Sequence, residues 1–584
     1  MIKTLVAANK SEKVPFKVPK TVQQSIPVQM IYPDGTWQVG HKHSKTWRFT
    51  DINYASASEA DQKRIFKSYC GVINSLPTDA SCKITIVNHR LNPVDFERTM
   101  LMKDQGDGLD HYRHESNQIL LDRATLSNNL VQDKYITVSI PQRKKKDSED
   151  YFSRVDANLT KSFNKLASNA SVLENADRLR LFHDFFRAGE DQFYRFDREA
   201  ILQSGASFKD IICPDGLSFK KDYFEMGGRF GRVLYLREYA SYLTDQLVSN
   251  LTNFPRNLVL SIDILPIPTD EAVKDIQRKI LGVESDITRW QQRQNGKNNF
   301  SANVPYELEQ SRADTREYLD DLTARDQRMI FAVVTLVHMA DTKEQLDADT
   351  ESLVSIGGES VCTFGTLRYE QEQGLNTVLP YGLRQIHSLR TLTTESAAAL
   401  MPFRVQEIQD RGGFCYGVNT ISRNLLICNR KRLISPHAFY LGVSGSGKSM
   451  TMKNTIKDVV LGTQDDVIII DAEREYGPIA RAMGGEVVQI SPYSPHHINP
   501  LEVSSALDKD ENPVALKSEL LNSIIEQQMG VGIFTGAHKS IIDRCVASVF
   551  RPWIKSKGKA PMPLLTDWRN EVLKQPEPEA KQTA

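Results

Sequence analysis

Residues 442–449 read Gly-Val-Ser-Gly-Ser-Gly-Lys-Ser and fit the phosphate-loop pattern GxxxxGK[ST]. The apolar segment 438–441 just before them predicts a short buried strand. After the loop, Met452, Ile456 and Val459 recur at helical spacing. A strand, a glycine-rich loop and a helix therefore follow one another in the order that a phosphate loop requires, and this stretch predicts an α/β nucleotide-binding domain.

The residue types in the loop explain the expected chemistry. Glycines at 442, 445 and 447 can adopt backbone conformations closed to other residues, so that successive N–H groups turn toward a polyphosphate. The positive end of the helix dipole adds to this attraction. Lys448 is expected to pair with the β- and γ-phosphates and to be catalytic, and the Ser449 hydroxyl is expected to bind Mg²⁺. The alternative is a simple turn rich in Gly and Ser.

ATP and Mg²⁺ are therefore the predicted cofactors. The residues predicted to contact the nucleotide are Gly442, Val443, Ser444, Gly445, Ser446, Gly447, Lys448, Ser449 and Met450.

The composition is that of an ordinary globular protein. The chain has 584 residues, of which 40% are hydrophobic and 25% charged. Lys+Arg and Asp+Glu both number 73, so the chain lacks the cationic excess of a dedicated nucleic-acid binder, although a local basic groove stays possible. DNA is therefore a possible partner that the net charge does not indicate.

Cysteine usage and apolar runs bear on the compartment. The 7 cysteines show no CxxC spacing, which argues against a disulfide framework and favours a reducing cytosol. The N-terminus lacks the apolar core of a signal peptide, and the apolar stretch 329–340 is too short and too polar to span a bilayer. We therefore expect a cytoplasmic protein that does not cross a membrane unaided.

The pattern along the chain predicts three regions. Alternating strand signals, as at 83–87 and 135–140, indicate an α+β domain over 1–150. A mixed α/β region over 151–405 is expected to hold a helix around 179–186, strands at 258–262 and 329–336, and a long helical hairpin over about 270–328 with its tip within 291–304. The α/β phosphate-loop domain occupies 406–584.

An acidic cluster follows the next predicted strand. Residues 467–470, Val-Ile-Ile-Ile, predict a central parallel strand buried on both faces, which ends in Asp471. Asp471, Glu473 and Glu475 then lie just past its carboxyl end, where open α/β sheets gather ligands. Such a cluster can hold water or metal near the γ-phosphate. The alternative is helix N-capping by Asp471, with the glutamates favoured by the helix dipole.

Several further motifs carry a family resemblance. They are Gly412–Asn419 (GGFCYGVN), Asn424–Leu426, the loop 442–449, the Asp-x-x-x-Glu-Tyr segment 471–476, Gly484–Glu486 and Ile498–Pro500, with Gln327–Met329, Leu379–Gly382 and Pro402–Phe403 upstream. Together they resemble the VirB-four family of conjugation ATPases of type IV secretion systems, and in detail the branch found on Gram-positive mobile elements. The likeness covers most of the chain.

The resemblance implies an N-terminal docking domain and a RecA-like motor domain of the HerA/FtsK class. Such proteins act as oligomers, commonly hexamers, at the cytoplasmic face of the membrane. There they contact membrane components of the secretion channel and couple ATP turnover to apparatus assembly and to export of DNA or protein. Asp471 and Glu475 occupy the family's Asp-x-x-x-Glu-Tyr positions and join Lys448 as expected catalytic residues. Ala472 stands where the family often has Pro.

One departure from the family concerns the metal-binding pair. The family is expected to carry a later strand ending in Asp-Glu, and no hydrophobic run ending in Asp-Glu follows the loop before Ala584. We expect that the motor domain is truncated, or alternatively that Asp471, Glu473 and Glu475 replace the pair. A nucleotide-binding scaffold without turnover and a HerA/FtsK-like DNA translocase remain the alternatives to a secretion motor.

Other candidates are weaker. His111 with His114, and the adjacent His496 and His497, lack further ligands at metal-site spacing and are expected to be ordinary surface or loop histidines. The stripe Ile541, Ile542, Cys545, Val549 predicts a core-facing helix. Arg544 or Arg551 on that helix is a minor candidate for an arginine finger at a subunit boundary.

Overall fold

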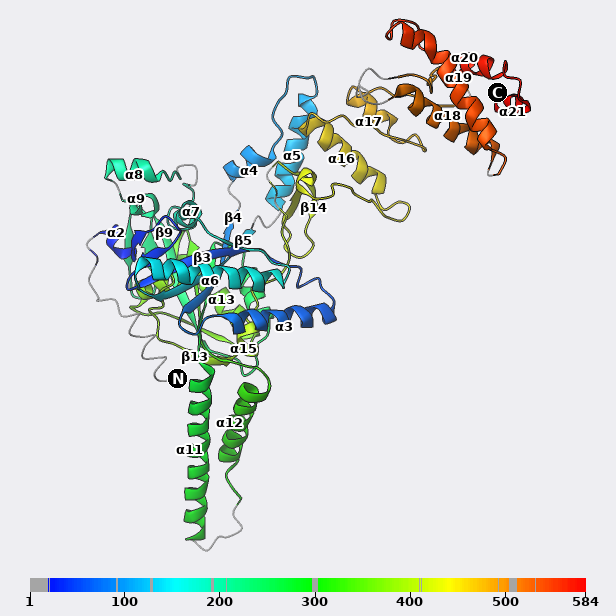
Figure 1. Cartoon of the computed structure of the whole chain (residues 1–584). Helices are drawn as coiled ribbons and strands as arrows, with labels where there is room; N and C mark the ends of the chain where they lie inside the picture. Colours follow the sequence, from blue (N-terminus) through cyan, green and yellow to red (C-terminus); the bar gives the residue numbers. More distant parts are fainter. Residues whose placement is uncertain are drawn as a thin grey trace. The chain divides into compact units, whose positions relative to one another are not determined.

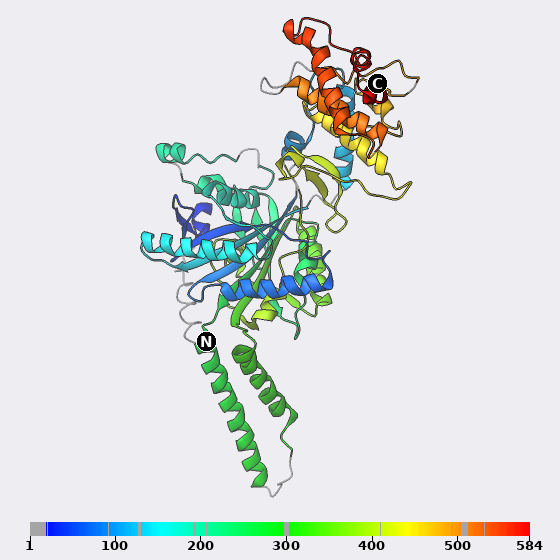
Figure 2. The same ribbon diagram turned by 45° about the vertical axis from the view of Figure 1, so that its right-hand side comes forward.

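The four strands predicted between Lys83 and Leu336 all form in the computed structural model of the chain. They lie within β4 (Ser81–Arg90), β5 (Leu130–Pro141), β10 (Leu258–Pro266) and β11 (Met329–Ala340). These strands are neighbours in the order β5-β4-β10-β11, and every pair is antiparallel. Strands from the ranges 1–150 and 151–405 thus belong to one sheet (Figures 1 and 2).

The structure describes residues 19, 21–90, 93–126, 130–190, 194–205, 207–296, 303–408, 410, 412–491, 493–503, 512–530 and 532–584. The chain divides into two compact units, Met1–Val467 and Ile468–Ala584. Within the described ranges, no helix combines the length and the apolar character that a membrane span needs.

The sheet of the first unit has 13 described strands in the order β1-β2-β3-β5-β4-β10-β11-β9-β8-β7, while β6 pairs with β3, β12 with β9 and β13 with β11. The remaining strands are β1 (Val28–Ile31), β2 (Trp37–Val39), β3 (Lys42–Phe49), β6 (Ala170–Val172), β7 (Leu217–Phe219), β8 (Phe224–Met226), β9 (Arg229–Glu238), β12 (Thr363–Thr366) and β13 (Arg390–Thr393).

Helices cover both faces of this sheet, and its central strands are therefore buried on both sides. In β10, Leu260 and Ile262 point to one core and Val259 to the other, as the period of a strand requires. The first core is covered by α3 (Glu59–Ser75), α6 (Lys145–Asn164), α10 (Gln246–Thr252), α13 (Lys343–Glu359) and α15 (Thr394–Ala398). The second is covered by α7 (Asn175–Phe186), α9 (Lys209–Ile212) and α14 (Gln371–Val378).

The second face also buries polar groups, and several of them pair across the sheet. Lys83 on β4 faces Asp263 on β10 in register, with 2.7 Å between Nζ and the carboxylate, and its ammonium also donates to the Thr377 carbonyl of α14. Next to this pair, the hydroxyls of Thr85 and Ser261 lie 2.8 Å apart. Such pairing offsets the cost of removing these groups from water, and it fixes the register of β4 against β10.

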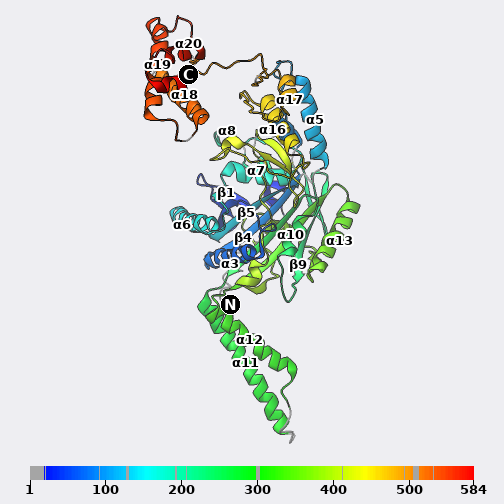
Figure 3. The same ribbon diagram turned by 90° about the vertical axis from the view of Figure 1, so that its right-hand side faces the viewer.

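The predicted helical hairpin is confirmed. α11 (Thr269–Asn295) and α12 (Tyr306–Ala324) run side by side and extend away from the sheet (Figures 1, 2 and 3). Both Arg312 and Arg316 of α12 pair with Glu284 of α11, at 2.9 and 3.0 Å. α11 continues to Asn295, so part of the predicted tip is helical, while residues 297–302 of that tip lie outside the described residues.

A helical insertion between β4 and β5 packs against the hairpin that precedes the phosphate loop. α4 (Pro93–Met100) and α5 (Asp110–Leu126) pack on the hairpin of β14 (Phe414–Val418) and β15 (Leu425–Cys428) through a small core that includes Phe96, Leu425 and Ile427. The helix that follows the loop is α16 (Lys448–Gly462), and it lies beside α5 and β14 (Figures 1 and 3). The first unit also contains α2 (Val22–Ser25), α8 (Arg198–Ser204) and a short 3-10 helix, η2 (Arg430–Arg432).

The second unit has its own helical core. Its helices are α17 (Gly477–Ala482), α18 (Pro513–Met529), α19 (Gly536–Lys555), α20 (Leu565–Val572) and α21 (Pro578–Thr583). The stripe predicted on α19 is confirmed as core-facing, since Ile541, Ile542 and Cys545 are at most 1% exposed. Arg544 pairs with Glu577 at 2.7 Å, so its charge is already matched within the unit.

Two strand predictions are wrong. Residues 438–441 and 467–470 have no regular secondary structure and pair with no strand among the described residues. Instead of being buried, Phe439 and Leu441 are each 90% exposed, and Ile468 and Ile470 are 92% and 98% exposed. An apolar run becomes a strand only when neighbouring backbones complete its hydrogen bonds, and neither segment has such neighbours in the part of the chain that the structure describes.

Candidate functional site

The loop 442–449 adopts the conformation that its glycines suggested. Gly445 and Gly447 have φ values of +81° and +89°, in the left-handed region that favours glycine. Gly447 is the N-cap of α16, which therefore begins at Lys448, and the helix predicted to follow the loop is confirmed. Gly442 is required for a different reason. Its φ is not positive, but a Cβ at this position would lie 2.4 Å from the Ser446 hydroxyl oxygen, so the loop closes here only on a residue without a side chain. Alternating left-handed residues of this kind direct main-chain N–H groups into a concave surface suited to an anion.

The loop is open to a ligand. A Cβ placed on Gly445 or Gly447 would meet nothing within 4 Å, and Lys448 is exposed beside the first turn of the helix. Ser449 is half-buried in that turn. This donor set fits a triphosphate: amides and a cation for the phosphates, and a hydroxyl for a magnesium ion bound to them. Within the described residues, no group of His, Cys, Asp and Glu forms a metal cluster by itself.

Side chains fix the loop to its helix at the first turn. Thr451 donates both its N–H and its hydroxyl to the Gly447 carbonyl, at 3.0 and 3.2 Å. The Tyr440 hydroxyl lies 2.9 Å from that of Thr455, which ties the segment before the loop to the second turn of α16. The segment before the loop is thus held by a contact to the helix and not by a sheet.

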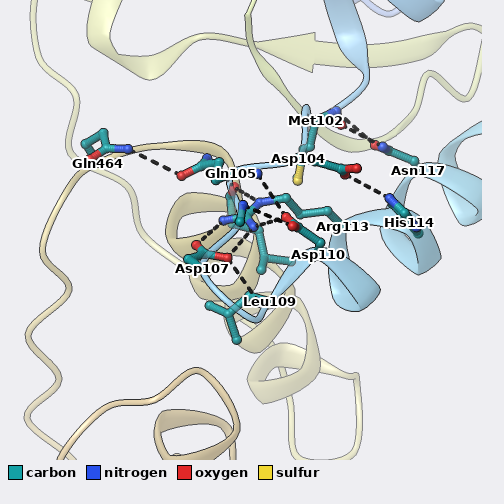
Figure 4. Close-up of polar contacts among 12 residues, drawn as sticks. Met102, Asp104, Gln105, Asp107, Leu109, Asp110, Arg113, His114, Asn117 and Gln464 are labelled. Carbon is teal, nitrogen blue, oxygen red and sulfur yellow. Dashed lines mark hydrogen bonds and ion pairs between the residues drawn. The ribbon is translucent and has the colours of Figure 1, made fainter.

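The far end of α16 is held by a buried arginine on α5, Arg113, whose contacts to Asp107 and Asp110 are drawn in Figure 4. The Arg113 guanidinium is fully buried and donates to the Leu461 carbonyl at 2.9 Å. It also contacts Asp107 and Asp110 at 2.6 Å each. The hydrogen bond from Arg113 holds the pKa of Asp107 well below its usual range. The pKa of Asp110 is also lowered, and the largest cause is the hydrogen bond that its carboxylate accepts from the Gln105 N–H. A cation at a helix C-terminus also opposes the negative end of the dipole.

The acidic segment belongs to the second unit, whereas the loop belongs to the first. The Asp471 carboxylate accepts the Tyr476 N–H at 2.8 Å, and this bond, together with further main-chain N–H groups of residues 473–475, lowers the pKa of Asp471. Because α17 starts only at Gly477, Asp471 stabilises the turn before the helix and is not the helix N-cap. Glu475 is exposed. The catalytic roles of Asp471 and Glu475 stay predictions.

The histidine candidates occupy ordinary positions. His114 contacts Asp104 at 2.8 Å on the surface of α5, and the ring of His111 packs against Tyr112. His496 and His497 are exposed in the second unit.

A cavity beside α16 was not indicated by the sequence. It has a volume of about 430 Å³, is open to one side, and is lined by residues of α5, β14 and one flank of α16. The α16 residues that line it are Thr451, Asn454, Thr455, Lys457 and Asp458, and all of these except Lys457 share one helical face. The residues of β14 lie in the glycine-rich run 412–419, a motif that indicates a family resemblance but not, by its sequence, a cavity. Only the packing of the insertion on the hairpin shows that this run lines a cavity.

The chain matches a known protein family over part of its length. Residues 422–546 match the family model described as the central domain of helicase HerA. This range is a minority of the chain and includes the loop 442–449. The match supports a P-loop ATPase domain of the HerA/FtsK type, for which ATP and typically Mg²⁺ are the cofactors, and it does not extend to the VirB-four family or its Gram-positive branch. No curated protein is similar enough to the chain to count as a relative.

Proposed function

We propose that this chain is an ATP-binding motor subunit of a conjugation-type secretion system. ATP binding and hydrolysis would be coupled there to assembly of the apparatus and to transfer of DNA or protein. The observation that carries the proposal is the loop 442–449, whose left-handed glycines open α16 at Lys448 inside a range similar to a HerA-type ATPase domain. The secretion role itself is supported by the motif resemblance over most of the chain.

The roles of individual residues follow from the site. The main-chain amides of 442–449 and Lys448 bind the phosphates, and the Ser449 hydroxyl is a ligand of Mg²⁺. Magnesium neutralises charge on the β- and γ-phosphates when it is bound. Asp471 and Glu475 are proposed to orient the attacking water. The proposed partners are membrane components of the channel and further copies of this chain in a hexamer, at the inner face of the membrane.

Steady-state phosphate release from ATP tests the motor. We expect Mg²⁺-dependent release by the full chain and a fall of about a hundredfold or more in Lys448→Ala, because the cation that stabilises the transferring phosphoryl group is lost. Lys453→Ala, on the same helix but outside the motif, is the matched control and should keep the rate. Equal background rates in all three proteins, with ATP still bound at equilibrium, would leave a nucleotide-binding scaffold instead of a motor.

A DNA translocase is the second candidate, and the similarity to a helicase domain favours it. It predicts that duplex DNA stimulates phosphate release and binds with a steep salt dependence, since contacts to DNA phosphates release counterions. A secretion motor without DNA contacts predicts a rate that DNA does not change. The balanced charge of the chain, with 73 basic and 73 acidic residues, weighs against the translocase.

A further inference from the structure

The helix α16 joins the phosphate loop to the helical insertion of the large sheet. Its first residue, Lys448, belongs to the loop, and its last turn is held by α5 of the insertion α4–α5, which leaves the sheet after β4 and returns to it in β5. A helix of 15 residues is about 22 Å long, because it rises about 1.5 Å per residue. Its hydrogen-bonded backbone moves as one body over that length, so a change at the loop reaches the insertion.

The C-terminal end of α16 is fixed from two sides. The Leu461 carbonyl accepts hydrogen bonds from Arg113 at 2.9 Å and from Gln105 at 3.2 Å. On the other side, Gly462 lies against the Phe414 ring of β14, since a Cβ on this glycine would come within 2.6 Å of the ring. The end of the helix therefore cannot shift unless α5 or β14 shifts with it.

The middle of α16 is less constrained than this end. One flank of the helix borders the open cavity of about 430 Å³, and Asn454 and Asp458 line that cavity instead of packing against a neighbouring helix. At the other end of α16, the loop is open around Gly445 and Gly447. Packed interfaces resist displacement and a void does not, so a helix held in this way can pivot about its C-terminal end.

The insertion is attached to the sheet at one place. It leaves β4 after Arg90 and enters β5 at Leu130, and these two residues face each other in register across the two strands. The turn of the β14–β15 hairpin is bound to the same place, because the Asn424 side-chain amide donates to the Leu130 carbonyl at 2.7 Å. Any displacement of the insertion is therefore received by β4 and β5, two central strands of the sheet.

We infer that nucleotide occupancy of the loop 442–449 is coupled to the insertion α4–α5 through the hydrogen bonds of Arg113 and Gln105 to Leu461. This coupling rests on the proposed function, because it needs a nucleotide on the loop, and it adds regulation to the same site. A triphosphate on the loop orders the first turn of α16. The ordered helix holds its last carbonyls in place for the two donors, so local opening of the insertion becomes rarer. Coupling between two sites is reciprocal, and a partner that immobilises the insertion therefore raises the affinity for ATP by the same factor.

Hydrogen exchange of the full chain with and without MgATP tests the coupling. In the wild type, MgATP should slow exchange in the loop and, by about threefold or more, in α5. The helix α13 is the internal reference, because it packs on β9, β11 and β12, and its exchange should not change. In Arg113→Met, MgATP should still protect the loop but no longer protect α5. His114→Ala is the matched control and should keep the wild-type response, since His114 contacts Asp104 and not α16.

A milder variant tests the same contact should Arg113→Met fail to fold. Gln105→Ala removes one of the two donors to Leu461 and leaves the buried guanidinium in place, so the response of α5 to MgATP should be smaller than in the wild type. A wild-type chain in which MgATP protects the loop but not α5 would overturn the coupling and leave the proposed function intact. So would a full α5 response in Arg113→Met or, where that variant does not fold, in Gln105→Ala. If MgATP protects neither segment and does not bind, the proposed function fails and the coupling fails with it.

Discussion

His338 shows how one buried residue makes the first unit sensitive to acid. It lies on β11, is fully buried, and its Nε2 contacts the Thr350 hydroxyl at 3.0 Å, while Nδ1 finds no partner in the described part of the chain. Burial, and to a lesser degree the Arg232 guanidinium, lowers the pKa of His338 to about 3. The Thr350 hydroxyl is itself engaged by Arg232 at 2.8 Å, so a second positive charge here would be poorly accommodated.

The sign of the pH dependence follows from proton binding. Below the usual histidine pKa of about 6.5, the unfolded chain binds a proton at this position, whereas the folded chain does not until the pH approaches 3. The free energy of unfolding therefore falls as the pH falls through this window. In His338→Gln we expect the slope between about pH 6 and about pH 4.5 to be shallower by about 1 kcal/mol per pH unit, measured by urea unfolding.

Exposed His387 supplies the control for this prediction. His387→Gln should keep the wild-type slope, because the side chain is exposed in the folded chain as well. Identical slopes in the wild type and His338→Gln would show that His338 is protonated in the folded state.

At the scale of elements, α16 is held at both ends, and its C-terminal anchor is testable. The last carbonyls of a helix lack intrahelical partners, and Arg113 and Gln105 donate to that of Leu461 (Figure 4). Arg113→Met should therefore increase hydrogen exchange in the last turn of α16 by about tenfold. Arg113→Lys should restore little of the protection from hydrogen exchange, because lysine lacks the planar guanidinium that reaches Asp107, Asp110 and Leu461 together.

His114→Ala is the matched control for the anchor. His114 is a neighbour of Arg113 on α5, but it contacts exposed Asp104 instead of α16. Exchange in the last turn should therefore stay at the wild-type rate. An equal rate in Arg113→Met would mean that the packing of Leu461, which is fully buried, holds this end without the guanidinium.

The same elements show what the sequence could predict and why. Local patterns were sufficient for α16, for the loop glycines at 445 and 447, and for strands such as β10 and β11, because their period and residue types are local properties. They failed at 438–441 and 467–470, because an apolar run does not reveal whether another backbone will pair with it. The contact between Arg113 and Leu461 spans 348 residues, and no local pattern contains it.

At the scale of the whole molecule, the two units differ greatly in the size of their cores. The core of the first unit joins thirteen described strands to helices on both faces, whereas the core of the second is formed by a few helices around residues such as Ile542 and Phe550. Small cores bury a smaller fraction of the surface of the unfolded chain and are only marginally stable. The second unit should therefore unfold first, in its own transition.

Matched Ile→Val substitutions assign the transitions in a calorimetric scan. Ile542 in the second unit and Ile262 in the first are both fully buried, so each change removes one methylene from a packed core at a cost of about 1 kcal/mol. Ile542→Val should lower only the first transition, by about 5 °C, and Ile262→Val only the second, by about 1–2 °C, because the larger unit has the larger unfolding entropy. A single transition that both variants shift equally would show that the units unfold together, in which case the helical core of the second unit draws its stability from the first.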